Sequence, residues 1–247
     1  MARIDGRAAD QLRQITIETD FVRFPEGSAL ITCGNTRVLC CASVEPFAPK
    51  HAPEGTGWVT AEYSMLPRAN RERSRRDISK LKLSPRSAEI QRLIGRSLRA
   101  AVDLSALPEL TITVDCDVLQ GDGGTRTASV TGGFVALALA CRKLMADGVL
   151  RVDPIRTYVA AVSAGIVEDQ LLLDLCYEED SAAQVDLNCV MNDQGRLIEL
   201  QGTGEGRAFT VGEQRALVEL CEKGIRELHA LQRQAIEKGR AHRGTSI

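Results

Sequence analysis

The chain has 247 residues, of which 44% are hydrophobic and 26% charged, and its formal net charge is −2. This composition excludes a disordered protein, and an aromatic content of 4% argues against RNA binding dominated by base stacking. The longest apolar run, residues 134–141, is far shorter than the roughly 20 residues of a membrane span, and residues 1–17 lack the apolar core of a secretory signal. We therefore expect a cytoplasmic protein that does not insert into a membrane.

The first part of the chain is predicted to form strands and one irregular loop. Three β-branched, apolar segments separated by turn residues indicate antiparallel strands at 14–22, 28–33 and 36–44. A further strand over 58–64 leads into residues 67–77, which are rich in arginine and have no apolar period. We expect this stretch to be a mobile surface loop.

The next segment is predicted to be an amphipathic helix. Ser84 is a typical N-cap and Pro85 suits the first helical position. Apolar residues then recur at helical spacing, at Ile90, Leu93, Ile94, Leu98 and Val102. At 100° per residue Arg86 falls on the side of this stripe, so we expect it to face the body of the protein. The opposite face carries Arg92, Arg96 and Arg99.

The second half is predicted to begin with a strand, a loop and a buried helix, at 110–118, 121–127 and 128–145. This order of elements is typical of ligand-binding sites. Four more strands are expected at 155–167, 170–177, 185–191 and 197–201. A long helix over 211–238 closes the chain. In this interpretation residues 171–191 form a β-hairpin with Asp180 at its tip.

Cysteines and histidines give no sign of a metal or redox centre. The eight cysteines stand singly among apolar residues, without a C-x-x-C pair or a histidine at ligand spacing. We interpret them as reduced core residues. The three histidines have no partner pattern either, so we expect a chemistry that does not use histidine.

The glycine-rich loop from Gly121 to Thr127, with the sequence GDGGTRT, is a candidate anion site. Glycines let a backbone approach a ligand closely, and free N–H groups at a helix N-terminus attract anions. Arg126 adds a guanidinium fork that matches phosphate oxygens. The loop is neither a P-loop nor a dinucleotide-binding fingerprint. The alternative is a flexible turn with Arg126 exposed.

Three further residues carry candidate chemistry. Arg86, if it faces inward, needs an anionic partner because an unpaired buried guanidinium is too costly; that partner is either a ligand or one of the chain's own carboxylates. Asp180 and Asp186 lie at the tip and on the return arm of the predicted hairpin, where alternation places Asp186 and Asn188 on one face. Such a pair can bind Mg²⁺ or supply a general acid, or its acids serve only the turn and solubility.

Positive charge is concentrated in one segment. From Arg68 to Arg99 the chain has 11 Lys and Arg against 3 Asp and Glu, a local excess of +8. A phosphate backbone requires such an excess. The loop arginines either form a solvated face or contact RNA backbone, and Arg92, Arg96 and Arg99 are further candidates for RNA contact.

Four long segments resemble bacterial ribonuclease PH. They are GWVTAEYSMLPRA (57–69), EIQRLIGRSLRA (89–100), DCDVLQGDGGTRTAS (115–129) and LIELQGTGEG (197–206). The similarity extends over essentially the whole chain. It implies an α/β fold of the α+β type, with mixed β-sheets and packed helices in a single ribonuclease PH domain over residues 1–247. It also implies a homohexamer built as a trimer of dimers.

The resemblance further implies roles for individual residues. Arg86, Gly124, Thr125 and Arg126 would bind inorganic phosphate as co-substrate. Asp180 and Asp186 would be the catalytic residues and would hold Mg²⁺. Arg68, Arg73 and Arg76 would contact tRNA. The chain departs from the family at Gly121, a usual alanine, at Pro85, a common glycine, and at Asn192-Asp193, a typical Thr-Gly. None of these removes a group that the chemistry needs, although Pro85 could change how Arg86 is presented.

The implied activity is that of a phosphate-dependent 3′-to-5′ exoribonuclease. It would trim the 3′ end of tRNA precursors and other RNA, release nucleoside 5′-diphosphates and run in reverse as a nucleotidyltransferase. One alternative is a non-catalytic RNA-binding member of the same superfamily, against which the intact Arg86, Arg126, Asp180 and Asp186 argue. A second is a hydrolytic nuclease, which normally needs a denser carboxylate cluster.

Overall fold

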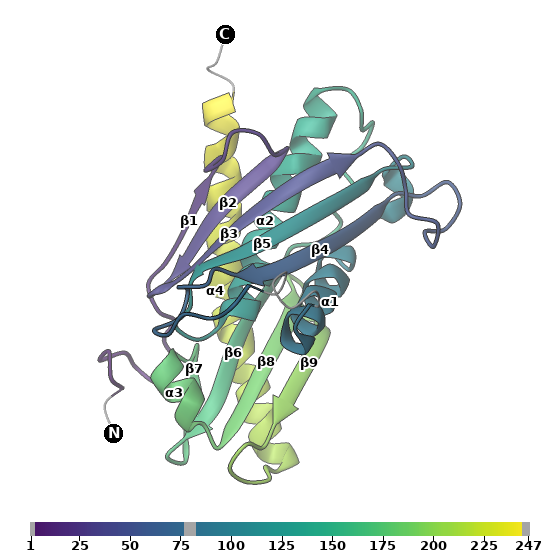
Figure 1. Cartoon of the computed structure of the whole chain (residues 1–247). Helices are drawn as coiled ribbons and strands as arrows, with labels where there is room; N and C mark the ends of the chain where they lie inside the picture. The colour runs from purple at the N-terminus through teal and green to yellow at the C-terminus, as the bar shows by residue number, and fades with distance from the viewer. Residues whose placement is uncertain (1–2, 77–82, 244–247) are drawn as a thin grey trace.

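The computed structural model describes residues 3–76 and 83–243, with side chains described up to residue 239. Residues 77–82, which hold the end of the predicted arginine-rich loop and part of the basic segment, lie outside the described residues. Two β-sheets and four α-helices make up the described part of the chain, in agreement with the predicted class (Figure 1). Helix α4 (Val211–Arg243) runs behind both sheets.

The first sheet confirms the predicted strands of the N-terminal half. Its five strands lie in the order β1 (Ile15–Thr19), β2 (Gly27–Cys33), β3 (Thr36–Glu45), β5 (Thr111–Gln120), β4 (Trp58–Met65). Strands β1 to β3 form the expected antiparallel meander. Strand β4 is parallel to β5, and such a pair requires a crossover. Helix α1 (Pro85–Arg99) provides it, with Ser84 as its N-cap, as predicted, and a short 3-10 helix (Leu104–Ala106) follows.

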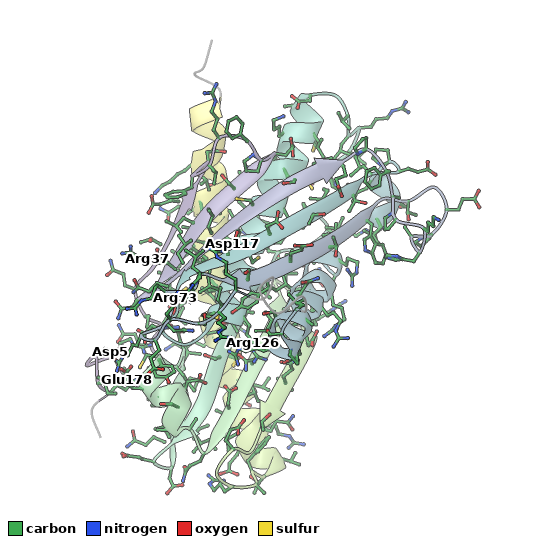
Figure 2. The ribbon with its side chains drawn as sticks, in the orientation of Figure 1. Asp5, Arg37, Arg73, Asp117, Arg126 and Glu178 are labelled. Atoms are coloured by element: carbon green, nitrogen blue, oxygen red, sulfur yellow. The ribbon has the colours of Figure 1, made fainter. Side chains whose placement is uncertain are left out.

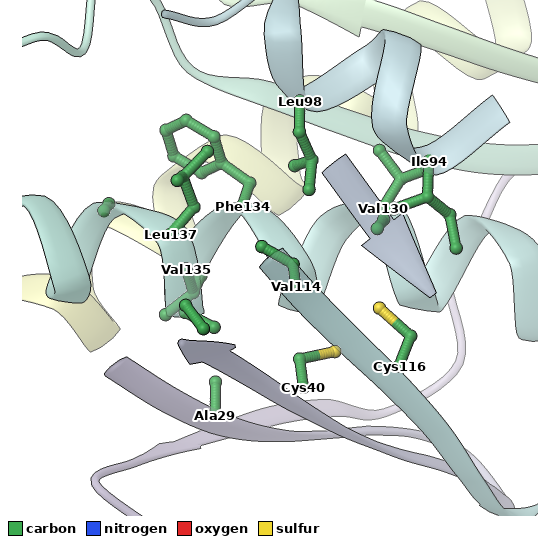
Figure 3. Close-up of a cluster of buried hydrophobic side chains, with 14 of the residues drawn as sticks. Ala29, Cys40, Ile94, Leu98, Val114, Cys116, Val130, Phe134, Val135 and Leu137 are labelled. Carbon is green, nitrogen blue, oxygen red and sulfur yellow. The ribbon is translucent and has the colours of Figure 1, made fainter. Parts of the chain in front are cut away.

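Helix α2 (Thr125–Ala146) is the centre of the main hydrophobic core. It packs on β2 and β3 of the first sheet and on β6 of the second, and Phe134, Val135 and Leu137 are fully buried in the core (Figure 3). A Cβ at Gly27 would lie 2.1 Å from the Ala136 carbonyl oxygen, so β2 can approach the helix this closely only because residue 27 is glycine. All eight cysteines are free and seven are buried, which confirms their prediction as core residues.

By length and composition alone, α2 could cross a membrane. However, 83% of its most apolar window is buried inside the protein. A helix that is apolar on every side and covered by two sheets and other helices belongs to a protein core. Burial therefore explains the apolar sequence of α2.

The second sheet is antiparallel and corrects part of the prediction. Its strands lie in the order β7 (Gln170–Leu173), β6 (Val159–Val167), β8 (Val185–Asn192), β9 (Leu197–Thr203). The predicted hairpin over 171–191 is wrong, because β6 lies between β7 and β8 and pairs with both. The predicted strand over 170–177 ends at Leu173, and a short helix, α3 (Tyr177–Ala182), precedes β8. Leu187 and Cys189 face a second core under α4.

Candidate functional site

The glycine loop between β5 and α2 has a backbone that requires glycine. Gly123 and Gly124 have φ angles of 75° and 65°, in the left-handed region that other residues rarely adopt. A Cβ at Gly123 would also lie 2.5 Å from the Leu175 carbonyl oxygen. Gly124 is the N-cap of α2 and no side chain caps the helix. The first N–H groups of α2 therefore have no intrahelical partner and favour an anion.

A pocket of about 340 Å³ lies at this helix terminus. It brings together every residue that the sequence proposed for phosphate binding and catalysis, namely Arg86, Gly124, Thr125, Arg126, Asp180 and Asp186. These residues come from four separate parts of the chain. Two guanidinium groups and two carboxylates thus line one pocket, an arrangement suited to transfer of a phosphoryl group.

Arg126 is held in place by neighbours from other elements. Its Nη1 donates a hydrogen bond to Gln201 Oε1 at 2.8 Å and lies 3.4 Å from Glu89 Oε1. Its side chain is 18% exposed, and Figure 2 shows it at the junction of the two sheets. Arg126 is therefore mostly buried, and not exposed as the alternative expected.

Arg86 lies on the pocket, but not as predicted. The sequence placed it toward the body of the protein, whereas its side chain is exposed. Arg86 stands in the first turn of α1, and the buried stripe of that helix begins only at Ser87 and Ile90. Within the described part of the chain, Arg86 forms no hydrogen bond or ion pair, although its charge acts on Asp180. Its guanidinium at the pocket wall is thus available to a ligand.

Asp180 and Asp186 approach the pocket from α3 and β8. Burial raises the pKa of Asp186 to about 6, and the nearby Asp180 charge adds to the effect. The pKa of Asp180 is also raised by partial burial, while Arg86 and Arg126 oppose the rise. Alternation along β8 points Asp186 and Asn188 into the pocket, as predicted, and Asn188 Nδ2 donates to Asp186 Oδ2 at 3.0 Å.

The carboxylates fit a divalent cation. Asp186 Oδ1 is buried and has no hydrogen-bond partner among the described residues, and buried polar atoms normally have one. Asp180, Asn188 and Glu205 line the same pocket with further oxygen atoms. Mg²⁺ typically takes one or two carboxylates and fills its remaining positions with water and substrate oxygens. The described residues contain no cluster of three or more His, Cys, Asp or Glu with metal-site geometry.

The arginine-rich loop lines a larger neighbouring cavity. This cavity of about 670 Å³ shares Arg86, Gly124, Thr125 and Asp180 with the first pocket, and loop residues 70–72 form part of its wall. The loop is anchored where Gly121 N donates to the Ala69 carbonyl at 2.8 Å. Arg68, Arg73 and Arg76 are exposed and belong to no helix or strand, as predicted for a surface loop.

Arg92, Arg96 and Arg99 lie together on one face of α1, as predicted, but outside the pocket. They line a separate groove of about 300 Å³ with His51 and Trp58. Arg96 pairs with Glu199 on β9, and the guanidinium of Arg99 stacks 4.6 Å from the centre of the Trp58 ring. Two of the three arginines therefore have partners within the protein.

Sequence reasoning missed several pocket residues. Ser163 on β6 and Glu205 after β9 line the pocket, and Gln201 orients Arg126. Ser163 is a single small polar residue in an otherwise apolar strand and carries no local signal, whereas Glu205, like Gln201, falls within a string that resembles the family. Gln201 lies within the LQGTGEG string, which is the only sign that it could have given.

Comparison with known proteins gives the family. Residues 11–143 match the 3′ exoribonuclease family, domain 1, and residues 157–220 match domain 2 of that family. The chain therefore belongs to the 3′ exoribonuclease family.

Among its relatives, ribonuclease PH of Bacillus pumilus is 54% identical over 247 residues, covering 99% of both chains. Ribonuclease PH of Bacillus subtilis is 55% identical over 236 residues, or 95% of this chain and 96% of the relative. The resemblance to bacterial ribonuclease PH is thereby confirmed.

A solved structure confirms the fold. The Archaeoglobus fulgidus exosome with RNA bound to the active site contains a chain with a TM-score of 0.77 at 24% identity. The match covers 92% of this chain and 91% of that one.

Proposed function

We propose that the protein is a phosphate-dependent 3′-to-5′ exoribonuclease that uses the 340 Å³ pocket as its active site. The observation that carries this proposal is the convergence of Arg86, Arg126 and the uncapped N-terminus of α2 on a space that Asp180 and Asp186 also line. Full-length similarity to ribonuclease PH supports the same activity.

Inorganic phosphate would bind between the two guanidinium groups and the amides at Gly124 to Arg126. One of its oxygens attacks the phosphorus of the 3′-terminal phosphodiester, and the bond from phosphorus to the preceding 3′-oxygen breaks. The products are a nucleoside 5′-diphosphate and an RNA with a new 3′-hydroxyl. Arg86 and Arg126 offset the repulsion between two anions and stabilise charge on the equatorial oxygens. One phosphoanhydride is made as one phosphodiester is broken, so we expect the reverse reaction as well.

Asp180 and Asp186 would serve the departing 3′-oxygen. A carboxyl group whose pKa is raised to about 6, as for Asp186, carries a proton often enough near neutral pH to act as a general acid. Alternatively, the two carboxylates hold Mg²⁺, with Asn188 and Glu205 nearby; when bound, the ion would stabilise negative charge on the leaving oxygen. Either role requires both side chains in the pocket.

The observations favour neither alternative function. A non-catalytic RNA-binding protein would not need the four charged side chains that converge here. A hydrolytic nuclease of the two-metal type needs a dense carboxylate cluster, and no such cluster occurs among the described residues.

The concentration of arginine in one loop supports a proposal for the cellular role. We propose that the exposed arginine loop holds the body of a tRNA precursor while its 3′ end enters the pocket. We further propose a cytoplasmic homohexamer, arranged as a trimer of dimers, as the active form. Sedimentation of the purified chain at micromolar concentration tests the assembly, and a monomer would contradict it.

The decisive experiment identifies the released nucleotide. A short RNA is incubated with the protein and Mg²⁺, with and without inorganic phosphate. We expect nucleoside 5′-diphosphates only when phosphate is present. Monophosphates without phosphate would indicate a hydrolase, and no release in either condition would indicate an RNA-binding protein.

A further inference from the structure

A buried ionic network joins the N-terminal segment to two walls of the pocket. One wall is the glycine loop from Gly121 to Thr127, and the other is the segment that leads into α3, which carries Asp180. Arg3, Arg7 and Arg13 meet Asp174 and Glu179, and each of these five side chains is at most 8% exposed. None of the five is among the residues that line the pocket. Buried charges are costly unless they are paired and hydrogen-bonded. Because these five charges lie outside the pocket but are buried at a cost, we ask what the network contributes to function.

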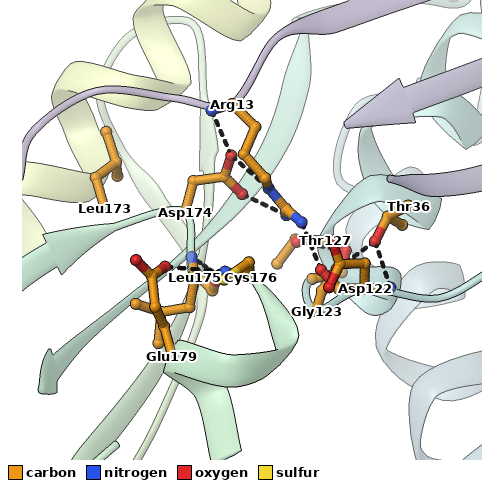
Figure 4. Close-up of polar contacts among 12 residues, drawn as sticks. Arg13, Thr36, Asp122, Gly123, Thr127, Leu173, Asp174, Leu175, Cys176 and Glu179 are labelled. Carbon is orange, nitrogen blue, oxygen red and sulfur yellow. Dashed lines mark hydrogen bonds and ion pairs between the residues drawn. The ribbon is translucent and has the colours of Figure 1, made fainter. Parts of the chain in front are cut away.

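Arg13 is the branch point of this network (Figure 4). Its Nε and Nη2 donate to the two carboxylate oxygens of Asp174 at 3.0 and 2.7 Å, and its backbone N–H donates to the same carboxylate. Its Nη1 donates to the Asp122 carbonyl at 2.6 Å. One guanidinium thus holds a carboxylate just before α3 and a carbonyl in the glycine loop. A lysine has no such fork and could not make both contacts in the same geometry.

Asp174 is held from both sides in an uncommon conformation. Its φ angle is 54°, in the left-handed region, and its backbone N–H donates to the Ser163 carbonyl at 2.7 Å. Ser163 itself lines the pocket. Such conformations persist where surrounding contacts over-determine them, and they concentrate at functional sites.

Arg3 extends the network to the helix that carries Asp180. Its Nε and Nη2 donate to the two carboxylate oxygens of Glu179 at 2.7 and 2.6 Å, and its Nη1 donates to the Leu173 carbonyl at 2.8 Å. Glu179 also accepts from the Cys176 backbone N–H at 3.1 Å, which fixes the first turn of α3. Glu179 precedes Asp180 directly in the sequence.

The glycine loop and the start of α3 contact each other next to Arg13. A Cβ at Gly124 would lie 2.9 Å from Arg13 Nη2, so the phosphate-binding loop rests on the guanidinium. Tyr177 N, at the start of α3, donates to Asp122 Oδ1 at 3.3 Å. A displacement of Arg13 would therefore shift both the glycine loop and α3.

We infer that the Arg13–Asp174 pair is a positioning device that sets the separation between the phosphate-binding loop and the aspartate helix. This inference rests on the proposed function, because it assigns phosphate to one wall and Asp180 chemistry to the other. Reactive groups must be placed within a fraction of an ångström, and a misplacement of about 1 Å can cost roughly 10²-fold in rate. Arg13 and Asp174 act through the residues that they hold and do not touch the substrate.

The test uses Arg13→Lys and Asp174→Asn, with Arg142→Lys as matched control. Arg142 donates one hydrogen bond to the Ile236 carbonyl near the far end of α2, so its replacement removes an arginine contact about 25 Å along the helix from the glycine loop. For both network variants we expect kcat/KM for phosphate to fall by roughly 10²-fold. We expect amide hydrogen exchange to accelerate together in residues 121–127 and 177–183. Neither change is expected in Arg142→Lys.

Network variants that lose thermal stability but keep wild-type kinetics and wild-type exchange in both segments would overturn the inference. A measurement on the wild type complements the variants in case they fold poorly. Added inorganic phosphate should slow exchange of the Arg13 amide as well as of the glycine loop, because the network links them. Protection confined to the loop would contradict the inference.

The same experiments distinguish a failure of the proposed function from a failure of this inference. In that case wild type and Arg142→Lys release no diphosphates, while hydrogen exchange in Arg13→Lys still decides whether the two walls are coupled.

Discussion

The side-chain amide of Asn188 orients Asp186 by donating to one of its carboxylate oxygens at 3.0 Å, while the other oxygen is buried and has no partner among the described residues. One oxygen is thus fixed by a hydrogen bond, and the other is buried without one in a residue that lines the pocket. This half-satisfied state is unfavourable for stability, because a buried carboxylate normally has its acceptors filled. It is favourable for function, because the open oxygen can receive a cation or carry a proton.

The first prediction concerns the pH dependence of stability. Burial and the neighbouring Asp180 raise the pKa of Asp186 from 3.8 to about 6, so the folded state prefers the neutral acid. The resulting stabilisation is present below pH 4 and is lost as the pH rises through 6. Above pH 7 the ionised group costs about 3 kcal/mol. Asp186→Asn should therefore raise the Tm at pH 7.5 in EDTA by roughly 6 to 12 °C.

The same variant should lose this advantage near pH 4 and should lose nearly all phosphorolysis at every pH. Thermal melts of variant and wild type at pH 7.5 and pH 4 show whether the difference in Tm has the expected sign and pH dependence. Equal stability of variant and wild type at pH 7.5 would mean that Asp186 carries no desolvation cost.

The second prediction separates the roles of the two aspartates. Asp180→Asn and Asp186→Asn should each nearly abolish phosphorolysis and leave RNA affinity close to normal, because asparagine keeps the shape but loses the charge and the proton. If both serve one metal site, the double variant should be little worse than either single variant. Excess Mg²⁺ should partly rescue a variant whose defect is metal affinity, and should not rescue the loss of a general acid. Near-wild-type activity in either single variant would remove that aspartate from the mechanism.

The third prediction concerns phosphate. Arg86→Ala and Arg126→Ala should each raise the KM for phosphate and lower kcat/KM by roughly 10- to 100-fold, the value of a hydrogen bond to a charged group. RNA affinity should change much less. Arg126→Ala should also destabilise the fold, because it leaves Gln201 without its donor, whereas Arg86→Ala should leave the Tm unchanged. The exposed Arg151, replaced by alanine, is the control, and unaltered phosphate dependence in both pocket variants would refute the site.

Local sequence patterns predicted most of the fold. The strands of the first sheet and helices α1, α2 and α4 were found because periodicity, turn residues and caps act within a few residues. Helix α3 was missed because it has only six residues and is held by Glu179, whose partner Arg3 lies 176 residues away in the sequence. The hairpin was wrong because strand order depends on pairing between distant segments, which alternation does not reveal.

The candidate site followed mainly from the family resemblance. Patterns within the chain named the glycine loop, Arg126, Arg86, Asp180 and Asp186 as candidates with alternatives left open, and the resemblance assigned their roles; the pocket contains all of them. The helical projection placed Arg86 toward the body of the protein, and this was wrong: Arg86 is exposed, because the buried stripe of α1 begins only after it and a projection does not show where the core ends. Arg13 and Asp174 were not predicted, because an arginine and an aspartate in separate irregular segments carry no signal before the fold joins them. That residues 1–247 form one domain stays a prediction.

The last prediction concerns RNA binding by the arginine loop. Arg68, Arg73 and Arg76 are exposed on a loop beside the cavity that adjoins the pocket. Replacing all three by alanine should weaken tRNA binding and flatten the plot of log K against log salt by roughly 0.7 to 0.9 for each phosphate contact that is lost. Phosphorolysis of short oligonucleotides should be spared, because the pocket itself is unchanged.

The triple replacement of Arg92, Arg96 and Arg99 is the informative comparison for that slope. The charge of Arg96 is offset by Glu199, and Arg99 is held on the Trp58 ring, so we expect a smaller change in slope than for the loop. Equal changes would show that the groove on α1 contributes as many phosphate contacts as the loop does. An unchanged slope in the loop variant would show that its arginines are only solvated, and the RNA path would then have to run elsewhere.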